Sequence, residues 1–177
     1  MRRFLDRLYA ASGAAAAVCL GLIAAVMLAQ AGMRKAGLLF RGGDDIAAWL
    51  CAASAFLALG YTFRSGDLVR VSLLLDRLPP SLRRGAEIAC LATALAVTGY
   101  ISWAAAGYVY QSWSEGELAQ GLIAIPIWIP QMSLVLGSLI LTLAVLDELV
   151  VVLRGGKPAY RVAEEERLAR QDFSENV

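Results

Sequence analysis

The sequence predicts an all-α integral membrane protein with four transmembrane helices, connector helices at the membrane interface and both termini in the cytoplasm. The first reason is composition, because apolar residues make up 59% of the 177 residues and charged residues only 18%, whereas soluble domains are nearer half apolar and a quarter charged. The second is a mean hydropathy of +0.61. The third is that charged residues divide the chain into four long uncharged runs.

Each uncharged run is long enough for a membrane span, which needs roughly 17–25 apolar residues, and the second run, with 18 residues, is near the minimum. The runs extend from Leu8 to Met33, from Ile46 to Phe63, from Ile88 to Ser114 and from Leu118 to Leu146. Because proline suits the first turn of a helix, the last span is expected to begin near Pro130, with Leu122 to Ile129 lying along the interface. The sequence therefore predicts one four-helix membrane domain over residues 1–155, with spans at about 8–32, 46–63, 87–112 and 130–153, and a polar cytoplasmic tail at 156–177.

The positive residues predict the orientation of these spans. Thirteen of the 16 Lys and Arg residues fall in the N-terminal segment, the second connector and the C-terminal tail, three fall in the first connector and none in the third. Cytoplasmic segments of membrane proteins carry the excess of positive residues. Both termini are therefore expected in the cytoplasm.

A cleaved signal peptide is the alternative interpretation of the N-terminus. It would use Arg2 and Arg3 before an apolar core, with Ala29-Gln30-Ala31 as the cleavage site. The apolar region is longer than the roughly 7–15 residues of a typical signal core, which favours a transmembrane helix.

The residue types present exclude several kinds of chemistry. The chain has no histidine, which removes the commonest proton shuttle and most zinc sites. Its three cysteines are isolated, and no Asp, Glu, Lys or Arg lies in the middle of a span, where coupled carriers usually keep an ionisable group. The net charge of +1 gives no support for nucleic-acid binding. We therefore expect no enzyme activity, no cofactor or metal site, and no self-sufficient proton-coupled carrier.

Two pairs of acidic residues flank the spans. Asp44 and Asp45 precede the second span, where aspartate is favoured as an N-cap and by the helix dipole; a partner-facing or metal-binding role stays open. Asp147 and Glu148 follow the last apolar run and are expected to be interfacial charges paired with Arg154.

Small residues recur at four-residue spacing in the first span. They are Gly13, Ala17, Gly21 and Ala25, and Ala29 continues the row. Side chains at this spacing share one helix face, and small ones permit close approach of another helix. We therefore expect a helix-packing face here.

The connector between the second and third spans is unusually apolar for a cytoplasmic segment. One helical stripe runs through Leu68, Val71, Leu75 and Leu78. Pro79-Pro80 would end this helix. A helix of this composition must lie among lipid headgroups or pack against protein, and the sequence leaves both open.

Three segments, taken in order, carry a resemblance to a known family. They are Asp44-Asp45-Ile46 with Trp49, Arg64-x-Gly66-x-Leu68-Val69-Arg70-Val71, and Ile125-Pro126-Ile127-Trp128-Ile129-Pro130. They resemble the acidic pair that opens the second helix, the R-x-G-x-H-I-x-V connector and the entry to the last helix of the small membrane subunit (the Q, or DctQ-type, subunit) of tripartite ATP-independent periplasmic (TRAP) transporters. The resemblance covers about residues 5–155. Asp67 and Ser72 depart from it, standing where the family often has histidine and aspartate.

The resemblance implies a non-catalytic subunit in the bacterial inner membrane. In this family a periplasmic binding protein captures the substrate, typically an organic acid, and a large membrane subunit moves it inward with sodium. The small subunit scaffolds the large one, so the implied partners are these two proteins and membrane lipid. The implied interface candidates are Asp44, Asp45, Trp49, Arg64, Gly66, Asp67, Arg70, Pro126, Trp128 and Pro130.

Two other functions remain as alternatives. One is a small integral membrane enzyme that acts at the headgroup region through Asp44 and Asp45, which would need a hard cation such as magnesium. The other is an assembly factor for a different complex.

Overall fold

Four long helices make up the fold. The computed structural model describes residues 2–38, 40–65 and 80–156. The helices are α1 (Arg2–Lys35), α2 (Gly43–Arg64), α4 (Pro80–Ser114) and α5 (Trp128–Leu153), and each is long and apolar enough to cross a membrane. The predicted all-α membrane fold is thus confirmed. The predicted connector helix after α2 lies outside the described residues.

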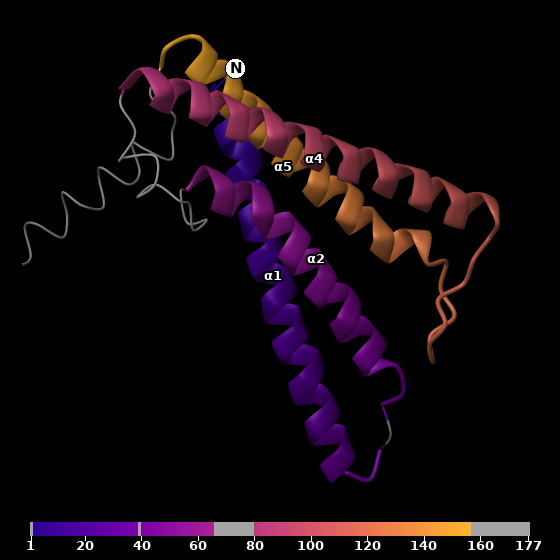
Figure 1. Cartoon of the computed structure of the whole chain (residues 1–177). Coiled ribbons are helices and arrows are strands. Elements are labelled where there is room, and N and C mark those ends of the chain that lie inside the picture. The colour runs from indigo at the N-terminus through magenta and orange to yellow at the C-terminus, as the bar shows by residue number, and fades with distance from the viewer. Residues whose placement is uncertain (1, 39, 66–79, 157–177) are drawn as a thin grey trace, which may run out of the picture.

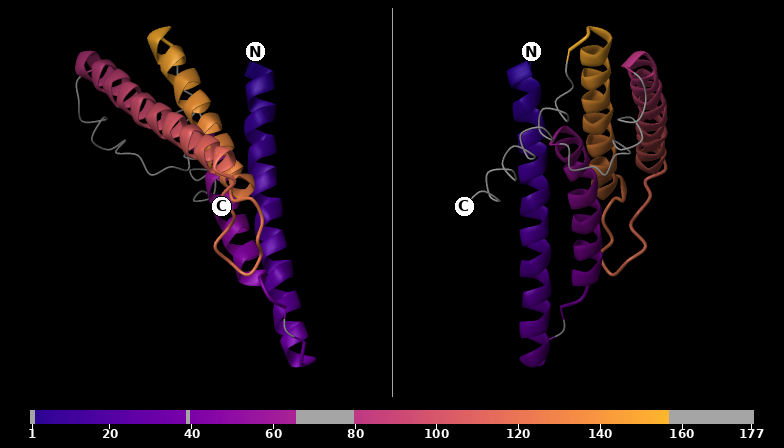
Figure 2. Two further views of the ribbon diagram at one scale, coloured as in Figure 1. Left: turned by 90° about the vertical axis from the view of Figure 1, so that its right-hand side faces the viewer. Right: turned by 60° about the vertical axis from the view of Figure 1, so that its left-hand side comes forward.

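The helices stand in a row in the order α1, α2, α5, α4 (Figure 1). Extensive contacts join α1 to α2, α2 to α5 and α5 to α4, and the right-hand view of Figure 2 shows the four side by side in that order. Two helical hairpins, α1–α2 and α4–α5, therefore meet through α2 and α5, and α1 and α4 form the edges of the row.

Glycines permit the closest approaches between neighbouring helices. Gly13 of α1 lies against the ring of Tyr61, and Gly60 of α2 lies against Ile140. Gly137 of α5 is buried, and a Cβ atom added to it would fall on the backbone of Phe56. The seam between α2 and α5 therefore depends on the absence of a side chain at two positions.

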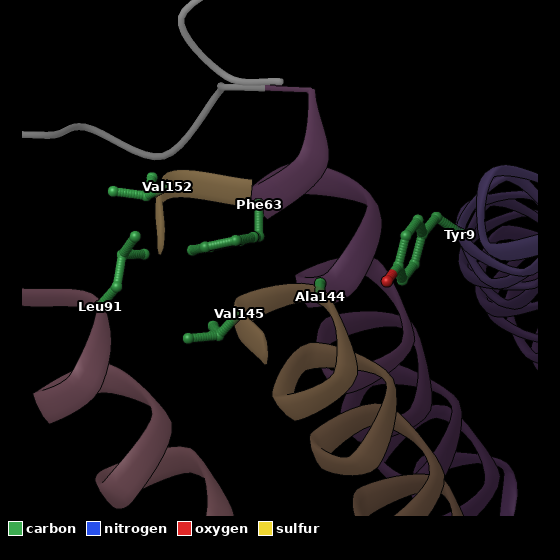
Figure 3. Close-up of a cluster of buried hydrophobic side chains, with 6 residues drawn as sticks. All are labelled: Tyr9, Phe63, Leu91, Ala144, Val145 and Val152. Atoms are coloured by element: carbon green, nitrogen blue, oxygen red, sulfur yellow. The ribbon is translucent and has the colours of Figure 1, made fainter. Parts of the chain in front are cut away.

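The end of the row that carries Arg64, here called the Arg64 end, holds the larger of two buried clusters. A buried apolar cluster there takes residues from every helix: Tyr9, Phe63, Leu91, Ala144, Val145 and Val152 (Figure 3). The opposite end, called the Asp45 end, has a smaller cluster of Ala105, Val109 and Val135 between α4 and α5. In Figure 1 the two hairpins diverge from the Arg64 end toward the Asp45 end.

The segment between α4 and α5 forms a small hairpin. An isolated bridge pairs Leu118 with Pro126, the amide of Ala119 donates to the carbonyl of Ile125 at 2.8 Å, and the amide of Ile127 donates to that of Glu117 at 3.0 Å. Residues 122–127 thus belong to this hairpin and to the turn into α5, and the position of residues 122–129 along the membrane interface stays a prediction.

The start of α5 also differs from the sequence prediction, because the helix begins at Trp128 and not at Pro130. The first amides of a helix have no partner within it, so Pro130 can occupy the third position without losing a hydrogen bond.

Candidate functional site

Arg64 is the centre of a charge cluster that joins three helices. Its Nη1 donates to Asp147 Oδ2 at 2.9 Å and to Glu148 Oε1 at 3.1 Å, and its Nη2 donates to Asp6 Oδ1 at 2.7 Å. Asp6 belongs to α1 and the other two carboxylates to α5. One guanidinium therefore links α1, α2 and α5, and its planar fork suits this task because it donates in several fixed directions.

Burial makes the cluster energetically demanding. Glu148 is 1% exposed and Asp147 is mostly buried, whereas half of the Asp6 side chain is exposed. A buried carboxylate is tolerated only with a close counter-charge, and Arg64 supplies it to both residues of α5. Tyr9, also 1% exposed, places its ring 5.7 Å from the Arg64 guanidinium carbon, within range of a cation–π contact.

The pairing of Asp147 and Glu148 with Arg154 is wrong. Both bind Arg64, which is 83 and 84 residues earlier in the sequence, and Arg154 is exposed at the C-cap of α5. The two carboxylates lie on the side of α5 that faces α2, whereas Arg154 follows the last residue of the helix. Arg154 is the nearest cation along the chain, whereas folding brings the more distant Arg64 within hydrogen-bonding distance of both carboxylates.

Asp45 forms a second tie, at the opposite end of α2. Its Oδ2 accepts a hydrogen bond from the amide of Leu122 at 2.8 Å, and Leu122 lies in the small hairpin that connects α4 to α5. Gly121 lies so close that a Cβ atom there would collide with the Asp45 carboxylate, and a Cβ on Gly42 would collide with Ile123. Asp45 thus bridges the gap between the two helical hairpins.

The expected N-cap role of this acidic pair is wrong. The N-cap of α2 is Gly42, with φ of 88°, and no side chain caps the helix. Asp44 and Asp45 lie in the first turn, where the helix dipole favours them. The Asp44 Oδ1 atom accepts from Gln30 Nε2 at 3.2 Å, which ties α1 to α2, so the two carboxylates face different neighbours.

The remaining interface candidates do not gather in one place. Trp49 is half-buried on α2, Pro126 belongs to the bridge and Pro130 to the first turn of α5. Trp128 lines an apolar groove of about 370 Å³ between α4 and α5. Pro126, Trp128 and Pro130 lie at the Asp45 end of the row, whereas Arg64 is about 28 Å from Asp45 along α2 at 1.5 Å per residue. Gly66, Asp67 and Arg70 lie outside the described residues.

The predicted helix-packing face of α1 is used in part within this chain. Gly13 packs against Tyr61, but nothing lies within 4 Å of the position that a Cβ atom on Gly21 would take. Ala17 and Ala25 are exposed. The face that α1 turns to its neighbours instead includes Ser12, Ala16, Cys19 and Ile23. Packing of the other small residues against a further helix stays a prediction.

Several residues of the site were not predicted. Asp6 and Tyr9 were missed although they sit one and two turns into α1, at the end where the antiparallel α2 must deliver Arg64. The hydroxyls of Ser102 and Thr142, 3.0 Å apart, join α4 to α5 and also escaped notice. Within the described residues, no group of three His, Cys, Asp or Glu is arranged to hold a metal ion.

Comparison with known proteins identifies the family. A family model of the DctQ component of tripartite ATP-independent periplasmic transporters matches residues 23–155, which include the Arg64 contacts to α5 and the Asp45 contact to the hairpin. A search of the curated proteins found no match. The chain therefore belongs to the DctQ family, the small membrane components of TRAP transporters.

Proposed function

We propose that the chain is the non-catalytic scaffold of a sodium-coupled TRAP transporter for organic acids, in which it braces the large transport subunit and works with a periplasmic substrate-binding protein. The observation that carries the scaffold role is the pair of ties at the two ends of α2. Arg64 links α1, α2 and α5, and Asp45 links α2 to the α4–α5 hairpin. A chain held at both ends is suited to stand still while a partner moves.

The alternative of a membrane enzyme built on Asp44 and Asp45 finds no support in these contacts. The two carboxylates bind Gln30 and the Leu122 amide, so each already has a structural role. An assembly factor would make the same internal contacts, and only its partners would differ.

Transport assays test the proposal directly. In vesicles, the chain alone should give no substrate uptake, because its ionisable clusters lie at the helix ends and hold the helices together. Uptake that depends on a sodium gradient should appear only when a large membrane subunit and a periplasmic binding protein are present, and their genes should lie beside that of this chain. Uptake by the purified chain alone would contradict the scaffold role.

The proposed orientation places the Arg64 end in the cytoplasm of a bacterial inner membrane. In a variant without Cys19, Cys51 and Cys90, a Ser114→Cys substitution at the Asp45 end should react with a membrane-impermeant maleimide added to intact cells. Ser81→Cys, at the start of α4, should react only after lysis. Labelling of Ser81→Cys in intact cells would show that the topology is the reverse of the one proposed.

A further inference from the structure

The two edges of the helix row differ in the chemistry of their exposed side chains. On α1 the large exposed residues are Val18, Leu20, Leu22, Met27 and Leu28. On α4 they include five aromatic residues, Tyr100, Trp103, Tyr108, Tyr110 and Trp113, each more than half exposed. Aliphatic side chains are satisfied by lipid tails, whereas Tyr and Trp each carry a hydrogen-bonding group.

The depth of these aromatic residues separates them into two groups. Trp113 and Tyr110 lie near the end of α4, where aromatic rings usually occupy the membrane interface. Tyr100 is about 20 Å from Trp113 and about 24 Å from Arg84 along the helix axis at 1.5 Å per residue. Since the hydrocarbon core is about 30 Å thick, Tyr100 and the neighbouring Trp103 lie near its middle.

At this depth neither residue is satisfied by lipid. Tyr100 is 67% and Trp103 is 73% exposed, and their rings pack against each other with centroids 6.0 Å apart. Within the described residues, neither the Tyr100 hydroxyl nor the Trp103 indole N–H makes a hydrogen bond. Hydrocarbon offers no acceptor, and an unsatisfied polar group in it is costly.

We propose that the aromatic face of α4, centred on Tyr100 and Trp103, docks a membrane-spanning helix of the large transport subunit that presents hydrogen-bond acceptors at mid-membrane depth. Such acceptors are Ser or Thr hydroxyls, side-chain amides or free backbone carbonyls. This inference rests on the function proposed above and adds which surface meets the partner.

The shape of the surface agrees with a helix as the occupant. Gly107 lies between Trp103 and Tyr110 on the same side of α4, and nothing lies within 4 Å of the position that its Cβ would take. Toward the Asp45 end, Tyr110 and Trp113 continue into the apolar groove shared with Trp128. A glycine notch between aromatic side chains leaves room for close approach of a second backbone.

The large exposed side chains of α1 and of the outward side of α5 are aliphatic and carry no hydrogen-bonding group. Between residues 10 and 29 the only hydroxyl on α1 is that of Ser12, which is buried and bonded to the Tyr9 carbonyl. The exposed side chains of α5 include Leu136, Leu139 and Leu143. These surfaces need no protein partner to satisfy a polar group.

Site-specific photocrosslinking in the assembled transporter tests this assignment. A p-benzoylphenylalanine that replaces Tyr100 or Trp103 should crosslink to the large subunit, whereas the same probe at Leu22 of α1 or Leu139 of α5 should give lipid adducts. Crosslinking of the large subunit from Leu22 or Leu139 but not from Tyr100 would overturn the choice of surface while leaving the scaffold function intact. A crosslinked dimer of this chain through Tyr100 would also overturn it.

A second measurement removes the hydrogen-bonding groups of both residues and keeps an aromatic ring at each position. The double variant Tyr100→Phe with Trp103→Phe should lower the yield of co-purified large subunit several-fold, with the same amount of this chain in the membrane. Tyr108→Phe, about 12 Å from Tyr100 toward the Asp45 end of α4 at 1.5 Å per residue, is the control for the loss of a tyrosine hydroxyl and should leave the yield unchanged. An unchanged yield in the double variant would contradict the proposal. Failure of the wild-type chain to co-purify with the large subunit would instead overturn the proposed function together with this surface.

Discussion

Replacing Arg64 with methionine should destabilise the chain by about 3–5 kcal/mol, because it removes from a buried ion cluster the guanidinium that binds both Asp147 and Glu148. Both contacts are close, at 2.9 Å to Asp147 and 3.1 Å to Glu148. Arg64→Lys should be intermediate, since one ammonium group cannot reproduce the three contacts of the fork. Thermal unfolding of the purified chain in detergent, followed by its tryptophan fluorescence, measures the loss.

Two controls separate charge from packing in this experiment. Arg154→Ala removes an exposed arginine at the same end and should leave the unfolding temperature unchanged. The triple variant Arg64→Met, Asp147→Asn, Glu148→Gln should recover much of the loss, because the two more deeply buried carboxylates are then neutral and Asp6 keeps its charge at a half-exposed position. If the triple variant is as unstable as Arg64→Met, the carboxylates are not the source of the cost.

Gly137→Val should separate α2 from α5 and lower stability by about 3 kcal/mol, at the upper end of the usual cost of overpacking. The new Cβ would meet the backbone of Phe56, and a backbone cannot rotate away as a flexible side chain can. Gly137→Ala should show the same effect in smaller measure. The readout is the unfolding temperature together with the fraction of monodisperse protein on size-exclusion chromatography.

Gly107→Ala is the matched control for helix propensity. Gly107 is also a glycine within a helix, but nothing lies within 4 Å of its added Cβ. Alanine favours a helix over glycine by about 1 kcal/mol, so this variant should be neutral or slightly stabilised. Equal stability of Gly137→Val and wild type would show that the α2–α5 seam can open without cost.

The helices were predictable from sequence because the signal for each is local. An uncharged apolar run needs no knowledge of its neighbours to be assigned as a span, and all four were found. The order of the helices in the row was not predictable, since α5 lies between α2 and α4 for reasons of surface fit. Gly60 meets Ile140 and Gly137 meets Phe56, and neither pairing leaves a periodic trace in the sequence.

The candidate site shows the same division. Arg64 and Asp45 were singled out by their place in family-like motifs, but their partners were not. Asp45 binds the amide of Leu122, 77 residues later, and a backbone donor has no residue type that would reveal it. Asp6 was missed because a single carboxylate near a terminus resembles any solvated charge. The signal for this contact is a pair of opposite charges at the same end of two antiparallel spans, here Asp6 at the start of α1 and Arg64 at the end of α2.

The row of helices also sets the mechanics of the chain. Helix axes that pack together are about 8–10 Å apart, so three successive seams place α1 roughly 25–30 Å from α4. If the transport subunit is held at the α4 edge, α1 stands at the far end of a lever arm of that length. A sideways force from a moving partner must then rotate the whole row of helices through viscous lipid. The torque that resists this rotation grows with the length of the row. A compact bundle of the same four helices would give a shorter arm and less resistance to rotation.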